Sequence, residues 1–181
     1  MRSLRPETAF CALLLLASCA SVKPRSTGQA AFVDAAAQEG LALRERYGAA
    51  ACTGRPAIHV LSKALHHTGF VASQMACRDA AGVWHQSLVA ETVPGLLDVP
   101  RALDANSERA LPPVDSLALD RLIASDALYE QSDNPNEQSV GVGATYHTME
   151  VTGPNGPYTI DWVGHLDGPA GQVADLIMGG A

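Results

Sequence analysis

Basic residues are scarce in the second half of this sequence, and none follows Arg121. Residues 101–181 hold three Lys or Arg against twelve Asp or Glu, a net charge of −9, whereas the whole chain carries −7. An acidic surface repels phosphate backbones, so we do not expect nucleic acid as a partner. It attracts a cationic protein surface or a hard cation. The alternative is that this charge serves solubility alone.

The motifs that mark common enzyme classes are also missing. The sequence has no G-x-S-x-G turn, no Walker or dinucleotide glycine motif and no H-E-x-x-H. The string GVGATY at 141–146 lies between a polar loop and an expected strand, so it does not replace them. No C-x-x-C is present, which excludes a thioredoxin-like redox role. We therefore expect no catalytic residue and no cofactor, with a small hydrolase as the alternative.

Histidines are present but scattered. Zinc needs three or four converging ligands. Two of the histidines, His66 and His67, are adjacent, so on a helix they would point about 100° apart. His147 falls on the apolar row of an expected strand, which is typical of a hydrogen-bonded core histidine. We expect no metal site, with a metal-handling protein as the alternative; the six are His59, His66, His67, His85, His147 and His165.

Only one long apolar run occurs, from Ala9 to Ala20. At about 1.5 Å per residue it covers roughly 18 Å of a hydrocarbon core of about 30 Å, which is too short for a span. Arg2 and Arg5 precede it, and small residues follow. This arrangement is typical of an export signal.

The residues Leu16-Ala17-Ser18-Cys19 resemble the lipobox of bacterial lipoproteins. The resemblance implies removal of residues 1–18 as a signal peptide, a diacylglycerol thioether on Cys19 and acylation of the new amino terminus. Several acyl chains form a stable membrane anchor. Ala20 follows the cysteine, which in a Gram-negative host implies the outer membrane, facing the periplasm. The alternative is an ordinary secretory signal, because Ser18 and Ala20 are small.

Cysteine usage agrees with export. Cys11 would leave with the signal and Cys19 would carry lipid, so Cys52 and Cys77 remain as a pair. In an oxidising compartment such a pair predicts a disulfide. The alternative is two buried thiols.

The rest of the chain is long enough for one domain. Residues 19–29 contain Pro24 and Gly28 and predict a flexible tether, and residues 30–181 predict a single globular domain. Good helix formers predict a helix over 30–51, although Gly40 weakens it. For 57–69 the spacing favours a helix over a strand. A hairpin is expected over 71–89, and four prolines predict an irregular connection over 90–113.

The clearest pattern lies near the C-terminus. We expect a helix over 115–125, a further turn from Asp126, a polar loop over 131–139 and a helix opened by Pro169. The strings ATYHTMEV and YTIDWV flank TGPNGP and predict a hairpin. Their inward rows are Met149, Val151, Tyr158, Ile160 and Trp162; the outward rows are Tyr146, Thr148, Glu150, Thr159 and Asp161. Together these elements predict an α+β fold, with a small antiparallel sheet and helices packed on one face.

This order of elements over residues 112–178 resembles the emfourins, small bacterial inhibitors of metalloproteases. The resemblance implies an inhibitor of an exported protease or other hydrolase, as one form of a non-catalytic interaction or accessory module. We expect the interaction surface on the acidic half, with a cationic protein as partner; its candidate residues are Asp133, Glu137, Glu150 and Asp161.

Overall fold

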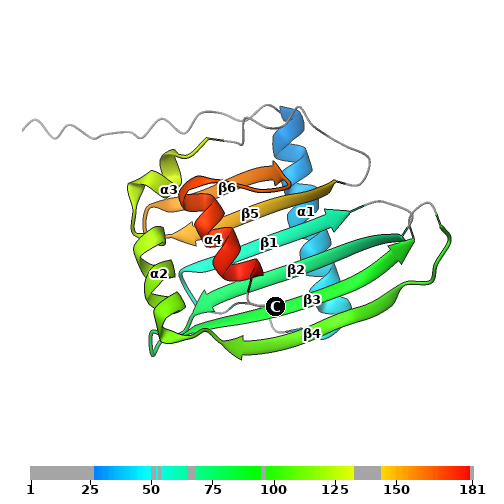
Figure 1. Ribbon diagram of the computed structural model, residues 1–181, viewed down its shortest axis with the longest axis horizontal. Helices are drawn as coiled ribbons and strands as arrows, with labels where there is room; N and C mark the ends of the chain where they lie inside the picture. Colours follow the sequence, from blue (N-terminus) through cyan, green and yellow to red (C-terminus); the bar gives the residue numbers. More distant parts are fainter. Residues whose placement is uncertain are drawn as a thin grey trace, which may run out of the picture.

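The computed structural model describes residues 27–49, 52, 54–64, 68–94, 97–132 and 144–179 (Figure 1). The predicted signal peptide, Cys19, most of the predicted tether and most of the 131–139 loop lie outside these residues. In the part of the chain that is described, no helix is both long and apolar enough to cross a bilayer.

The described residues form six strands and four helices. The strands are β1 (Ala57–Ala64), β2 (Thr68–Arg78), β3 (Trp84–Pro94), β4 (Ala102–Ala110), β5 (Thr145–Gly153) and β6 (Gly156–Val163). The helices are α1 (Thr27–Arg46), α2 (Pro113–Ile123), α3 (Asp126–Glu130) and α4 (Gly168–Met178). All strands belong to one antiparallel sheet in the order β4-β3-β2-β1-β5-β6. The predicted α+β class is therefore confirmed.

Each face of the sheet carries its own apolar core. On one face, which we call the helix-layer face, α2, α3 and α4 cover residues such as Val60, Met149 and Trp162. On the other, the α1 face, Ala36 and Leu43 of α1 cover a smaller apolar group that includes Leu61, Val71, Val89 and Val93. Figure 1 shows α4 in front of the sheet and α1 behind it. The predicted one-sided packing thus holds for α2, α3 and α4, and α1 adds a layer on the opposite face.

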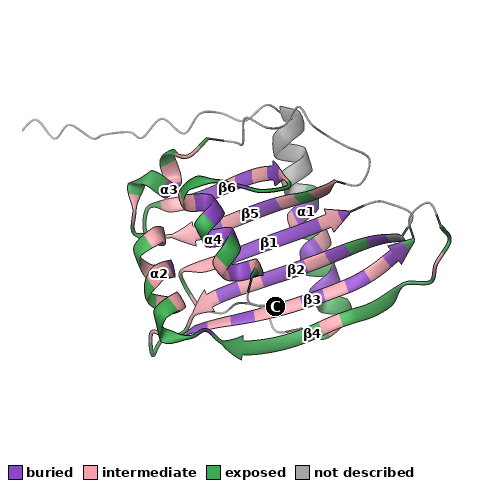
Figure 2. Ribbon diagram, in the orientation of Figure 1, coloured by how far each residue is buried: buried purple, intermediate pink, exposed green. Residues whose placement is uncertain are grey.

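Residues 57–64 and 68–69, predicted as parts of a helix, form β1 and the beginning of β2 instead. Strand β1 lies between β2 and β5, so Val60 pairs with Gln74 on one side and with Met149 on the other. Six of its eight residues are buried, on both faces (Figure 2). A strand buried on both faces shows no polar alternation, and its apolar residues then also match a helical spacing.

The predicted irregular connection over 90–113 is also wrong. Strand β3 continues to Pro94, and β4 occupies residues 102–110. The four prolines lie at the ends of β3, β4 and α2 rather than inside a strand, so they bound these elements. Strand β4 shows no alternation because nearly all of its residues are exposed on both faces (Figure 2).

The other predicted helices and hairpins are present, although α1 begins at Thr27, inside the predicted tether, and ends at Arg46. Strands β2 and β3 form the expected hairpin, whose turn is closed by Asp79, which accepts a hydrogen bond from the Val83 amide at 2.8 Å. The hairpin of β5 and β6 has the predicted inward row, with Met149, Ile160 and Trp162 buried. Thr148, expected in solvent, is 5% exposed because its row belongs to the α1 face.

The predicted disulfide between Cys52 and Cys77 is present, with 5.7 Å between the two Cα atoms. It ties the segment before β1 to the end of β2. Gly54 follows closely, and a Cβ atom there would lie 2.0 Å from the carbonyl oxygen of Arg78. Only glycine allows the two backbones to approach this far.

Candidate functional site

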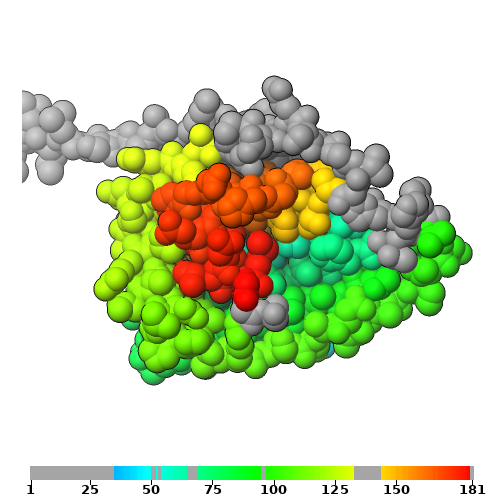
Figure 3. Space-filling model, in the orientation of Figure 1, coloured from blue at the N-terminus to red at the C-terminus, as the bar shows by residue number. Residues whose placement is uncertain are grey.

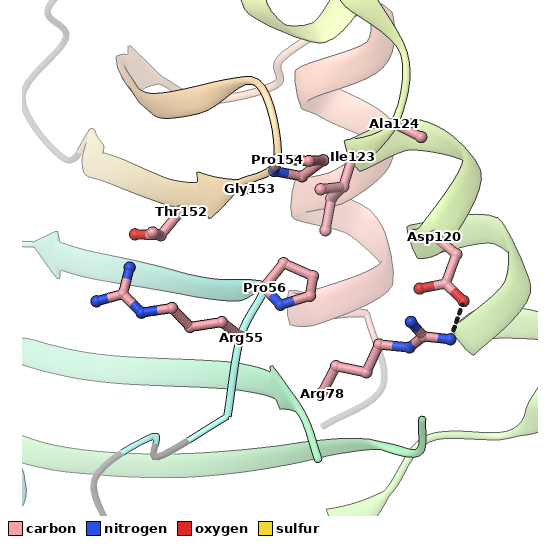
Figure 4. A pocket seen from close by; sticks show the side chains of 9 residues that line it. All are labelled: Arg55, Pro56, Arg78, Asp120, Ile123, Ala124, Thr152, Gly153 and Pro154. Carbon is pink, nitrogen blue, oxygen red and sulfur yellow. Dashed lines mark ion pairs between the residues drawn. The ribbon is translucent and has the colours of Figure 1, made fainter. Parts of the chain in front are cut away.

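A cleft of about 570 Å³ lies at one end of the sheet, next to the disulfide. Four parts of the chain form its walls: the segment before β1, the end of β2, the turn between β5 and β6, and the C-terminal end of α2 (Figure 4). Nine residues line it: Arg55, Pro56, Arg78, Asp120, Ile123, Ala124, Thr152, Gly153 and Pro154.

One side of the cleft is held by hydrogen bonds. Arg78 forms an ion pair with Asp120, with 3.2 Å between Nη2 and Oδ2 (Figure 4). Its Nε also donates to the carbonyl oxygen of Gly82 at 3.3 Å. The indole nitrogen of Trp84 donates to the other carboxylate oxygen of Asp120 at 3.0 Å. Because Trp84 is fully buried, this bond anchors Asp120, and through it Arg78, to the core.

The opposite side carries Arg55, which is exposed and makes no ion pair with any described residue. Its guanidinium group and the hydroxyl of Thr152 lie on the same side of the cleft (Figure 4). The lining residues include no Ser, Cys or His, so the cleft offers charge and hydrogen bonds but no nucleophile paired with a base.

A serine and a histidine do meet beneath α1. His59 Nε2 and Ser73 Oγ share a hydrogen bond of 2.9 Å, and Arg44 donates to the carbonyl oxygen of Ser73 at 3.3 Å and to Ser87 Oγ. These residue types occur in nucleophilic sites. However, Ser73 is fully buried and His59 is 8% exposed, so no substrate reaches the pair. The bond gives each of these two buried side chains a hydrogen-bond partner, as a structural role requires.

The backbone of α1 rests on the ring of His59. A Cβ atom at Gly40 would lie 2.7 Å from two atoms of the imidazole. Burial, together with the charge of Arg44, lowers the pKa of His59 from 6.5 to about 4. The histidine is therefore neutral at pH 7.

On the same face of the sheet, Glu91 forms hydrogen bonds with three side chains. It is 2% exposed and accepts hydrogen bonds from Arg46, Tyr47 and Arg101. Burial alone would raise the pKa of Glu91, but these hydrogen bonds and the two positive charges outweigh it and lower that pKa. A carboxylate with three donors is not a free base, and removal of one of these donors would leave its buried negative charge incompletely compensated.

A second serine–histidine pair lies on the helix-layer face. Ser62 Oγ and His147 Nδ1 are 2.8 Å apart, and the His147 ring stacks on Trp162 with 4.8 Å between centroids. Burial lowers the pKa of His147 to about 4. The predicted hydrogen bond of His147 is therefore present, and the residue is half-buried rather than fully inside the core.

Of the four acidic residues predicted as an interaction surface, the structure describes two, Glu150 and Asp161. They lie on β5 and β6 and are half-buried on the α1 face. In the register of the two strands, Glu150 lies opposite Thr159 and Asp161 lies opposite Thr148. Asp133 and Glu137 lie outside the described residues, as do Cys19, His66 and His67.

The four histidines that the structure describes are His59, His85, His147 and His165. Over the described ranges, no three His, Cys, Asp or Glu side chains come together as a metal site would require.

The sequence did not reveal the cleft, because its lining residues are up to about a hundred positions apart. One signal was available. A disulfide between Cys52 and Cys77 necessarily brings Arg55 close to Arg78, two arginines in a chain with few basic residues.

No protein-family model, curated protein or solved structure matches this chain.

The buried, neutral His59 predicts a loss of stability in acid. Its folded-state pKa lies below the unfolded value, so the unfolded chain takes up a proton first as the pH falls below about 6.5, and stability declines until about pH 4. We expect this residue to remove about 2 kcal/mol between pH 7 and pH 5. Urea unfolding of the soluble domain at both pH values measures the loss.

The variant His59→Gln cannot take up the proton but keeps a polar group near Ser73. Its stability should therefore fall less between pH 7 and pH 5 than that of the wild type. Equal losses in the two proteins would show that His59 is not buried in its neutral form.

Proposed function

We propose that this protein is a lipid-anchored domain of the bacterial cell envelope that binds another protein and catalyses no reaction. The observation that carries the proposal is the lipobox-like Leu16-Ala17-Ser18-Cys19 at the end of a short apolar run. Acylation of Cys19 would anchor the chain, and Ala20 after it favours the outer membrane in a Gram-negative host.

Two structural features support an exported, tethered domain. The Cys52–Cys77 disulfide is typical of proteins that fold in an oxidising compartment. In addition, α1 begins at Thr27, so the chain from Cys19 to this helix can span at most roughly 29 Å. The domain would then work close to the membrane surface.

Binding is favoured over catalysis by the surroundings of the reactive side chains. The buried Ser73–His59 pair has no access for a substrate, and the cleft beside the disulfide is lined by arginine, aspartate, threonine and apolar residues. Inhibition of an exported hydrolase is one form that such a binding role would take.

The charge of the helix layer supports a cationic partner. The outward side chains of α3, α4 and the turn before α4 include exposed carboxylates, and Arg121 is the last basic residue of the chain. In Figure 3 the atoms of α2, α3 and α4 adjoin one another on one face of the molecule. The exposed carboxylates are Asp126, Glu130, Asp167 and Asp175.

The anchor is tested by metabolic labelling with an alkynyl fatty acid in a Gram-negative host. The full-length chain should be labelled, and Cys19→Ser should carry no label, because no thioether can form without the thiol. Cys11→Ser is the matched control: it also removes one cysteine from the apolar run and should be labelled like the wild type. Equal labelling of Cys19→Ser, or an unlabelled wild type, would contradict the anchor.

The cationic partner is tested by reversing charge on the helix layer. The double variant Glu130→Lys/Asp175→Lys should lose partners that photo-crosslinking captures in the envelope, because it places positive charge where a cationic surface would dock. The control Glu45→Lys/Asp98→Lys makes the same change in net charge at exposed positions outside the helix layer, and should keep those partners. The interaction should also weaken between about 50 and 300 mM salt, as exposed charges are screened. Equal loss in both double variants would contradict a partner on the helix layer.

A further inference from the structure

We infer that the cleft beside the disulfide binds a carboxylate that is attached to an apolar group, as in the last residue of a peptide chain. This inference uses a different surface from the acidic helix layer. It depends neither on the lipid anchor nor on a cationic partner.

The first argument is charge. The protein has a net charge of −7, yet the cleft carries two arginines, Arg55 and Arg78, against one carboxylate, Asp120. Because Asp120 pairs with Arg78, Arg55 leaves the cleft with a net positive charge on a protein that is otherwise acidic. A cleft with net positive charge raises the local concentration of anionic ligands.

The second argument is the division of roles between the two arginines. Arg78 is held by Asp120 and by the carbonyl oxygen of Gly82, so its geometry is fixed. Arg55 has no ion-pair partner among the described residues, so its planar group is available to a ligand. An arginine receives a carboxylate through two parallel hydrogen bonds. The hydroxyl of Thr152, on the same side of the cleft, is a further donor (Figure 4).

The third argument concerns the charge of the ligand. Asp120 lies in the opposite wall, and the C-terminal end of α2, at Ile123 and Ala124, presents the negative end of the helix dipole. Both disfavour a second negative charge. A carboxylate with a single charge therefore fits better than a phosphate dianion.

The fourth argument concerns the rest of the ligand. Between the two arginines the cleft is lined by apolar side chains from three elements, Pro56, Ile123 and Pro154 (Figure 4). Gly153 packs closely against Ile123 and Tyr129, so no side chain narrows the cleft there. The volume of about 570 Å³ is in the range of small-ligand pockets and accommodates one apolar residue with its carboxylate.

The experiment titrates the isotope-labelled full chain, with its disulfide intact and Cys19 replaced by Ser for solubility, and follows amide NMR shifts. The probes are N-acetyl-leucine and its amide, which differ only in the negative charge. We expect N-acetyl-leucine to shift the amides of Arg55, Thr152 and Gly153 saturably at concentrations up to about 50 mM, as befits so small a ligand. The amide probe should leave them unchanged.

Two variants that lose the same charge separate the site from general electrostatics. Arg55→Gln should weaken the binding of N-acetyl-leucine by about tenfold, the effect of losing a charge-assisted hydrogen bond. Arg121→Gln, an exposed arginine of α2 that does not line the cleft, should bind like the wild type.

Three outcomes would overturn the inference. Equal shifts with the two probes would show that the carboxylate is not recognised. Equal weakening by Arg55→Gln and Arg121→Gln would show a general effect of charge. Inorganic phosphate that shifts the same amides at lower concentrations than N-acetyl-leucine would show a phosphate site without an apolar subsite.

Discussion

The packing of α1 on the imidazole ring of His59 is the contact on which the arrangement of the sheet depends. Gly40 brings the helix backbone against the ring, Ser73 hydrogen-bonds the ring nitrogen, and Arg44 reaches past it to β2 and β3. Buried polar groups of this kind are costly unless each finds a partner. The cluster therefore fixes where α1 lies, and α1 in turn covers one face of the central strands.

With α1 in place, β1 is buried on both faces and paired on both edges. This position explains how the two halves of the chain are joined. The β5–β6 hairpin, more than eighty residues later in the chain, extends the sheet from β1, and α2, α3 and α4 cover the other face. The cleft with Arg55 and Arg78 is a consequence of the same topology, because it forms where the start of β1, the end of β2 and the C-terminal hairpin meet.

Sequence patterns predicted the elements whose two faces differ. The β5–β6 hairpin, with one apolar row buried against the helix layer, and α2, with Leu119 and Ile123 buried, are examples. The patterns failed for strands whose two faces are alike. Both faces of β1 are buried, and both faces of β4 are exposed. No pattern in the sequence indicates that Arg44, which is 2% exposed, is buried. The partners of Arg44 and the walls of the cleft come from distant parts of the chain, so they are seen only in the three-dimensional structure. For the cleft, the predicted disulfide gave one indication, because it brings Arg55 near Arg78.

The substitution Gly40→Ala tests most directly whether α1 is held against His59. In an ordinary helix interior it would stabilise the protein by about 1 kcal/mol. Here the added methyl group meets the imidazole, so we expect a loss of about 1–3 kcal/mol in the free energy of unfolding. In the background of His59→Ala the same substitution should stabilise, because the ring is gone. Stabilisation by Gly40→Ala in both backgrounds, measured by urea unfolding of the four proteins, would contradict the account.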